Sequence, residues 1–171
     1  MKKILLPALL SVTLFASQNS DYVGIGGGNS WFAVDKPTEK VTNDGLHGTF
    51  TLGHKYEDYG RFYVSGTYLN SSDAVSSSGV YSVAYDAMFP IVDDMLSFYV
   101  GPVVGYTTYT EGNLDLSGLH YGGETGLTLS FGDTFEIEGG YRFLKETGES
   151  LTTKARDMQM AYLQVNFYFK Y

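Results

Sequence analysis

The feature that most constrains this chain is an alternation of period two that recurs along most of its length. Eight segments place apolar or aromatic side chains at every second position, and clusters of Gly, Asn, Asp, Ser and Pro separate them. A period of two is the side-chain period of a β-strand, and regularly spaced turn clusters are typical of an all-β protein. The expected strands are residues 21–33, 46–56, 61–70, 80–89, 96–110, 118–131, 135–146 and 158–171.

The second face of these strands distinguishes two kinds of barrel. A soluble barrel packs its apolar face inside and presents a charged face to water, with roughly 25–35% charged residues. Here the second face is padded with Gly, Ser, Thr and Tyr, and its few charges balance: Lys55, Arg61, Arg142, Lys170, Asp86, Glu124, Glu136 and Glu138. We therefore expect the polar face to line a closed interior and the apolar face to meet lipid. The alternative is a soluble, lipocalin-like barrel with the apolar face inside.

Strand and loop lengths also favour a membrane barrel. Strands of ten or more residues are long enough for a tilted crossing, which takes ~9–11 residues, and aromatic residues stand near the ends of the apolar faces. The connections are short at 57–60, 90–95 and 132–134, and longer and polar at 34–45, 71–79, 111–117 and 147–157. Short turns at one end and longer loops at the other are typical of outer-membrane barrels. Eight strands then place both termini at the short-turn end, in the periplasm.

The first sixteen residues have the composition of a secretory signal peptide. Lys2 and Lys3 precede an apolar run over residues 4–15, and Ala16 is a small residue suited to cleavage. The run is too short for a membrane-spanning helix, which needs ~20 apolar residues. We expect residues 1–16 to be removed and residues 17–171 to form one barrel domain. The chain has no Cys and a net charge of -8, so we expect no disulfide and no nucleic-acid partner.

The last residues carry the most specific local pattern. Tyr171 is aromatic and final, and the apolar face behind it continues through Leu163, Val165, Phe167 and Phe169. This pattern resembles the signal that the outer-membrane assembly machinery recognises. With the aromatic and glycine-rich run at 22–28, it makes the chain similar to the porin-family small barrels: the membrane domain of outer membrane protein A, the X-type proteins and the opacity-protein group. The resemblance implies an eight-stranded antiparallel up-and-down transmembrane β-barrel in the outer membrane of a Gram-negative bacterium.

The tight turn at 132–134 fixes which interior residues face one another. A slip of one residue would exchange the two faces, so Phe131 must pair with Phe135. That register sets Glu124 opposite Arg142, and we expect a buried ion pair there, with Glu138 nearby as a second acceptor.

We also expect Lys170 to meet Glu136 at the lower end of the last two strands. We favour a structural role for these ion pairs, which fill and satisfy the interior. The alternative is a gate, in which breaking a pair opens a narrow water path. An eight-stranded barrel has room for side chains and little more, so a wide diffusion pore is not expected.

Pro102 falls inside the expected strand 96–110. Proline has no amide hydrogen and removes one donor from the ladder of a closed sheet. We therefore expect a bulge or a local kink at this position.

Some small outer-membrane barrels are lipid A-modifying enzymes, so His47, His54 and His120 are the candidate catalytic residues. The deacylase type has a His-x-Ser pair on one strand face, and no histidine here is followed by Ser at that spacing. The acyltransferase type uses His, Asp and Ser near the outer loops, and His47 with Ser72 and Asp73 fits that role only loosely. We expect no enzyme activity, no cofactor and no metal site.

The sequence thus predicts a monomeric barrel that supports the integrity of the cell envelope. Its expected partners are outer-membrane lipid, lipopolysaccharide and the assembly machinery. A second hypothesis is adhesion or ligand recognition by the outward loops, above all 34–45 and 147–157. A narrow solute channel ranks third, and a lipid-modifying enzyme last.

Overall fold

The structure is a computed structural model of the chain. It describes residues 20–35, 40–56, 59–71, 76–92, 95–111, 114–115, 117–150 and 153–169. The signal peptide expected over 1–16 lies outside these residues, so the division at residue 16 stays a prediction. Among the described residues, no helix has the length and hydropathy of a membrane span.

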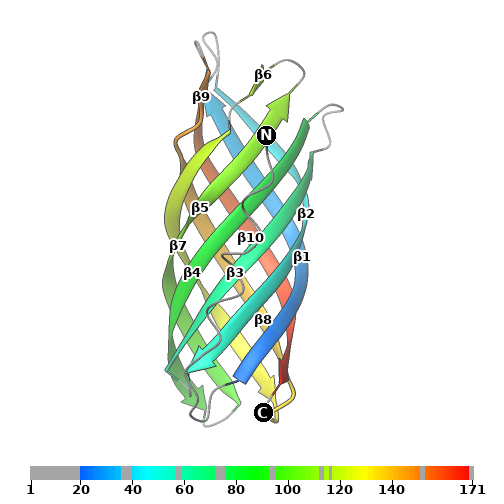
Figure 1. Cartoon of the computed structure of the whole chain (residues 1–171), viewed down its shortest axis with the longest axis vertical. Helices are drawn as coiled ribbons and strands as arrows, with labels where there is room; N and C mark the ends of the chain where they lie inside the picture. The colour runs from blue at the N-terminus through cyan, green and yellow to red at the C-terminus, as the bar shows by residue number, and fades with distance from the viewer. Residues whose placement is uncertain are drawn as a thin grey trace, which may run out of the picture.

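Eight long strands form one antiparallel sheet that closes on itself (Figure 1). They are β1 (Ser20–Asp35), β2 (Lys40–Tyr56), β3 (Gly60–Ser71), β4 (Ser76–Val92), β5 (Leu96–Glu111), β7 (Gly118–Phe131), β8 (Phe135–Glu146) and β10 (Thr153–Phe169). Two short strands, β6 (Leu114–Asp115) and β9 (Glu149–Ser150), pair with β5 and β10 at the upper end. Because β1 also pairs with β10, the long strands leave no open edge. The expected eight-stranded barrel is confirmed.

The register of the ladders fixes the stagger of the barrel. A path from Tyr22 that steps between paired residues once around the barrel returns to β1 at Phe32, ten residues further on. It runs through Gly53, Tyr63, Ala84, Val103, Gly122, Leu144 and Met158. This stagger over eight strands corresponds to a strand tilt of about 40°.

The apolar face of the barrel is its outer face. Ile25, Phe50, Leu52, Val104 and Leu127 stand exposed on the outside, whereas the charged residues of the alternate positions are buried inside. The orientation expected from the sequence is therefore confirmed, and the lipocalin-like alternative is wrong.

Two rings of exposed aromatic side chains border this outer apolar band. The lower ring contains Tyr56, Phe89, Phe98, Phe131 and Phe167, and the upper ring contains Tyr68, Tyr81, Tyr106, Tyr121 and Phe143. On β7 the two rings are ten residues apart, which at ~3.3 Å per residue and the tilt above is about 25 Å. That is the height of the apolar band on an outer-membrane barrel.

The interior has two zones. The lower and middle parts are charged and polar, and they are built around Arg61 and Arg142. The upper part is mixed: Phe32, Val34, Leu69, Val80, Tyr109, Leu144, Ala155, Met158 and Met160 are buried there together with polar side chains such as Thr107, His120 and Glu146. The upper zone gives the strands a packed core above the upper aromatic ring.

The upper connections are shorter than the sequence suggests. Residues 34–35 and 40–45 belong to paired strands, and pairing between β1 and β2 continues to Asp35 and Lys40. Residues 76–79, 149–150 and 153–157 are also strand residues. The boundaries expected at 34–45, 71–79 and 147–157 are therefore wrong. Polar outward residues obscure the alternation there, while inward residues such as Phe32 and Val34 still pack in the upper core.

The register at the tight turn is the expected one. Phe131 pairs with Phe135, and their rings stack at 4.8 Å. Gly132 has φ 63°, a left-handed conformation that favours glycine in such a turn.

Pro102 interrupts the pairing of β4 with β5 but does not shift its register. Pairing between β4 and β5 stops at Ala84 and Val103 and resumes at Ala87 and Val100 in the same register. The expected bulge is therefore wrong, and the irregularity at Pro102 is an interrupted ladder in an unchanged register. The missing amide donor is tolerated because the proline ring points outward and the pairing of Pro102 with Gly123 on β7 is kept.

Candidate functional site

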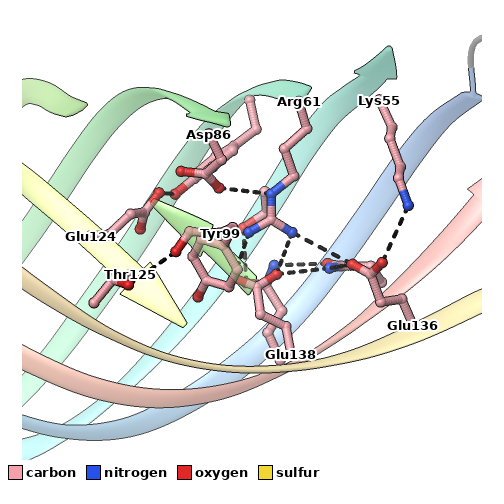
Figure 2. Close-up of polar contacts among 12 residues, drawn as sticks. Lys55, Arg61, Asp86, Tyr99, Glu124, Thr125, Glu136 and Glu138 are labelled. Carbon is pink, nitrogen blue, oxygen red and sulfur yellow. Dashed lines mark hydrogen bonds and ion pairs between the residues drawn. The ribbon is translucent and has the colours of Figure 1, made fainter. Parts of the chain in front are cut away.

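The lower lumen is organised around the buried guanidinium of Arg61, which is 0% exposed. Its Nε donates to Asp86 Oδ2 at 2.7 Å, and its Nη1 and Nη2 donate to Glu138 at 2.6 and 2.8 Å. Figure 2 shows Arg61 between Asp86 and Glu138, with the Tyr99 ring against it. The guanidinium carbon lies 4.5 Å from the centroid of that ring. This two-pronged geometry is the strongest form of an arginine–carboxylate pair.

Arg142 forms a second centre higher in the lumen. Its Nε and Nη2 donate to Glu124 Oε2 at 2.9 and 2.8 Å. Nη2 also donates to Tyr63 Oη at 2.8 Å, and Tyr63 Oη in turn donates to Glu124 Oε1. The phenol therefore closes a ring of hydrogen bonds around the ion pair.

Tyr162 connects the two centres. Its Oη lies 3.2 Å from Glu124 Oε2 and 3.1 Å from Glu138 Oε1. The Oη atoms of Tyr162 and Tyr99 are also 2.8 Å apart. The lumen thus holds one continuous charged network rather than separate ion pairs.

Glu136 forms the lower end of this network. Lys55 Nζ lies 3.5 Å from Glu136 Oε2, and Tyr168 Oη donates to Glu136 Oε1 at 3.0 Å. Asn166 Nδ2 donates to Glu138 at 3.0 Å and to Glu136 at 3.4 Å, and so joins the two carboxylates. The Lys55 side chain is 18% exposed at the lower mouth.

Glycines in the wall make room for these large side chains. A Cβ at Gly140 would lie 2.0 Å from Tyr99 Oη, and one at Gly101 would lie 2.4 Å from Asp86 Oδ1. The barrel can hold two arginines and several tyrosines because its wall is thin at such points.

The structure brings Glu124 and Arg142 together in the expected register. Glu138 was expected to accept a hydrogen bond from Arg142. Instead, both of its carboxylate oxygens accept from Arg61. Lys170 lies outside the described residues, so its expected contact with Glu136 has no structural counterpart here. Lys55 and Arg61 Nη1 are the cations near Glu136.

The expected assembly residues lie on the outer face of β10. Leu163, Phe167 and Phe169 are exposed, and Val165 is half-buried on the same face. Tyr171 lies outside the described residues. Their role as a signal stays a prediction.

Sequence reasoning missed the Arg61 centre. Both Arg61 and Asp86 stand out as rare charges on polar faces, and they are direct neighbours across β3 and β4. Glu138, however, is on β8, which is not adjacent to β3. Register arithmetic finds only neighbours in the sheet, so a contact across the lumen needs the closed barrel.

The known proteins that this chain resembles are similar in structure. No family model and no curated protein matches the sequence. The crystal structure of neisserial surface protein A matches with a TM-score of 0.66 and 18% identity, over 90% of this chain and 100% of that chain. The chain has the fold of the small outer-membrane β-barrels. The N-terminal barrel domain of Pseudomonas aeruginosa OprF matches with a TM-score of 0.58 and 18% identity, over 89% and 100%.

This fold carries more than one activity. The outer membrane enzyme PagL matches with a TM-score of 0.50 and 14% identity, over 85% of this chain and 97% of that chain. The presence of an enzyme among the matches means that the fold by itself does not decide whether a barrel is catalytic. Whether this barrel is catalytic must be argued from its own side chains.

The three histidines are not gathered in one place. His54 is on the outside, 2.6 Å from Asp21. His47 faces the lumen, and neither of its ring nitrogens has a hydrogen-bond partner among the described residues. His120 is buried and lies 3.0 Å from Ser82 Oγ and 2.9 Å from Thr107 Oγ1. In the part of the chain that the structure describes, no His, Asp and Glu side chains form a group suited to a metal ion.

Glu146 lies above the upper aromatic ring and has an altered acidity. Burial raises its pKa to about 7, and the hydrogen bond from Thr107 opposes that rise. The carboxyl group is therefore close to half protonated at neutral pH.

Proposed function

We propose that the protein is an integral outer-membrane barrel with a structural role in envelope integrity. The observation that carries the proposal is the outer apolar band of about 25 Å between two aromatic rings. A water-facing barrel with such a surface would expose far more contiguous apolar area than soluble proteins tolerate. The termini of the barrel domain then face the periplasm, because β1 begins and β10 ends at the end with the short turns.

The lumen supports a structural rather than a transport role. Arg61, Arg142 and their carboxylates fill the lower part with mutually satisfied charges. Above them the interior is filled by buried side chains, both apolar and polar. We therefore propose that the charged network is a structural support rather than a gate.

The same burial argues against catalysis. Ser82 and His120 form a hydroxyl–imidazole pair, but they are only 3% and 2% exposed inside the wall. A lipid on the outer surface has no contact with either group. We therefore propose a non-enzymatic barrel that acts as a monomer, with lipid, lipopolysaccharide and the assembly machinery as its partners.

Cell fractionation and gel electrophoresis test this proposal. The protein should be recovered in the outer membrane, and its band should shift when the sample is boiled, because a closed barrel resists detergent when cold. A soluble periplasmic protein with no heat-dependent shift would contradict the proposal.

Adhesion through the outer end is the second candidate function. The observation that favours it is the extension of paired strands above the upper aromatic ring, which presents the outer connections on a rigid base. Replacement of residues 36–39 by a two-residue turn should then abolish binding to a host-cell or phage surface without affecting the heat-dependent gel shift. Unchanged binding would exclude that connection as the contact.

A further inference from the structure

The Lys and Arg residues that do not belong to the lumen gather in one sector of the upper end. The described residues outside the lumen network include four of them: Lys40, Lys145, Lys154 and Arg156. These four stand on β2, β8 and β10, which together with β1 form one continuous stretch of the sheet. Within the described residues, β3, β4, β5 and β7 carry no Lys or Arg outside the lumen. Only one sector of the upper rim therefore offers positive charge.

Lys145 and Arg156 lie on adjacent strands of this sector, directly above the upper aromatic ring. Lys145 is two residues above Phe143 of that ring on the outer face of β8, and it pairs across the sheet with Asp157. Arg156 precedes Asp157 on β10. Both cationic side chains are exposed, that of Arg156 by 45%. Because an aromatic ring marks the membrane interface, the two cations stand at the depth of the lipid headgroups.

A β-bulge places Arg156 on the outer face. β1 pairs with Asp157 and, one residue further along, with Ala155, so Arg156 is the extra residue on β10. Ala155 and Met158 are both buried inside, and the two residues between them both stand outward. Regular alternation would leave only one outward residue there. Bulges are common at the rims of barrels, where they change the direction of a side chain in this way.

The carboxylates of the sector leave these two cations available. Arg156 Nη1 lies 3.6 Å from Asp35 Oδ1, which is too long for a hydrogen bond, and an ion pair this exposed contributes little. Lys145 and Asp157 are partners in the register but form no ion pair within the described chain. A guanidinium and an ammonium thus face the headgroup region with most of their hydrogen-bond donors unused.

Trp31 lies beside the two cations and is the only tryptophan of the chain. It pairs with Gln159 on β10, which in turn pairs with Phe143 on β8. Its side chain is therefore on the outer face at the level of the upper ring, one strand away from Arg156. Tryptophan is typical of this depth, because its ring is apolar and its N–H is polar.

We propose that Lys145 and Arg156 bind a phosphate group of lipopolysaccharide in the outer leaflet, with Trp31 at the edge of the same site. The inference rests on the proposed function, because such a site meets a lipid only in a barrel that spans the outer membrane. Lipopolysaccharide carries phosphates on the sugars that bear its acyl chains, which places them just above the hydrocarbon. An arginine donates two parallel N–H bonds to a phosphate, and a lysine adds a point charge.

The test follows Trp31 fluorescence while the folded full chain, in detergent micelles, is titrated with lipopolysaccharide that lacks the O-chain. The chain has one Trp, so the signal comes from beside the proposed site, and the midpoint of the titration measures affinity. The same titration with phosphatase-treated lipopolysaccharide tests the phosphate. A third titration with phosphatidylglycerol, another anionic lipid, tests whether any lipid phosphate suffices.

Lys145→Gln and Arg156→Gln each remove one positive charge from the site, and Lys145→Arg keeps it. Asn70→Asp is the matched control, because it changes the net charge by the same amount. Asn70 is exposed on the outer face of β3, two residues above Tyr68 of the upper ring, on the wall opposite β8. The heat-dependent gel shift shows for each variant that the barrel is folded.

We expect each Gln variant to weaken binding about fivefold, which corresponds to the effect of one cation near a charged membrane surface. Lys145→Arg and Asn70→Asp should bind as wild type does, the latter because a distant exposed charge is screened. Phosphatase treatment should weaken binding to wild type and abolish the difference between wild type and the Gln variants.

Equal weakening in Lys145→Gln and Asn70→Asp would overturn the site, and so would a wild type that shows no titration. Undiminished binding of phosphatase-treated lipopolysaccharide would overturn the role of phosphate. Equal affinity for phosphatidylglycerol would overturn the assignment to lipopolysaccharide. A wild-type chain without a heat-dependent gel shift would instead contradict the proposed membrane function.

Discussion

Arg61 on β3 and Glu138 on β8 are joined by two hydrogen bonds across the lumen, although their strands are not neighbours in the sheet. This contact ties opposite walls of the barrel together. Strand number and stagger set the radius of the barrel, and this contact adds a link between two walls that share no backbone hydrogen bond. The Arg61 network therefore bears on the stability of the barrel.

Removal of the Arg61 charge should be strongly destabilising. In Arg61→Met, Asp86 and Glu138 remain buried without their cation, and loss of one partner of a buried pair costs ~3–5 kcal/mol. Urea-induced unfolding in lipid vesicles measures the change. The triple variant Arg61→Met, Asp86→Leu, Glu138→Met should recover part of the lost stability. No loss in Arg61→Met would contradict the account.

The two buried tyrosines Tyr63 and Tyr22 should respond differently to loss of their hydroxyl groups. Tyr63 Oη links Arg142 to Glu124, so Tyr63→Phe should lower the free energy of unfolding by ~1–3 kcal/mol. Tyr22 is as buried, but its Oη has no hydrogen-bond partner among the described residues, so Tyr22→Phe should be neutral or stabilising. The same unfolding measurement compares the two variants. A larger loss of unfolding free energy in Tyr22→Phe than in Tyr63→Phe would contradict the prediction.

Space inside the wall can be tested with alanine. At Gly140 a Cβ would meet Tyr99 Oη at 2.0 Å, whereas at Gly48 no atom of the described residues lies within 4 Å. Gly140→Ala should therefore lower stability, and Gly48→Ala should leave it nearly unchanged. Adding Tyr99→Phe to Gly140→Ala should restore part of the loss by removing the oxygen. The measurement is the temperature at which half of the protein no longer runs as the folded band on a gel. Equal temperatures for the two alanine variants would contradict the close approach at Gly140.

Glu146 should make stability depend on pH. Its pKa is raised from 4.5 in the unfolded chain to about 7 in the barrel, where Thr107 links it to His120. Between these values the folded protein binds more protons, so this residue's contribution is full below pH 4.5 and is lost as pH rises through 7. The loss is at most about 3 kcal/mol. The difference in unfolding free energy between wild type and Glu146→Gln, measured from pH 4 to 8, should fall with rising pH, and a flat or rising difference would contradict the raised pKa.

The fold could be predicted because strands and their register follow from patterns between residues close together in the sequence. Alternation of period two identifies the strands, and the three-residue turn before Phe135 fixes the register that places Glu124 opposite Arg142. The upper strand ends were missed because outward positions such as Thr42 and Asp44 are polar above the upper ring. The alternation of apolar and polar residues is lost there, although Val34 still packs inside the barrel.

The candidate site could be predicted only in part. The ion pair between adjacent strands follows from register, but the Arg61–Glu138 contact and the Tyr162 link depend on the barrel's stagger and on which side chains are long enough to cross it. The hydroxyl–imidazole chain from Ser82 to Glu146 spans four strands and has no counterpart in sequence spacing. Such contacts are set in space and not along the chain.

The most direct test of a lipid-facing outer surface compares two exposed apolar residues at different depths. Ile25 lies in the middle of the apolar band and is 64% exposed, whereas Leu46 lies level with the upper aromatic ring and is 67% exposed. Arginine on a lipid-facing strand costs ~2–4 kcal/mol at the midplane and ~0–1 kcal/mol near the interface. In lipid vesicles, Ile25→Arg should therefore lower the free energy of unfolding by several times the loss in Leu46→Arg. Equally small losses in both variants would place this face in water and contradict the membrane barrel.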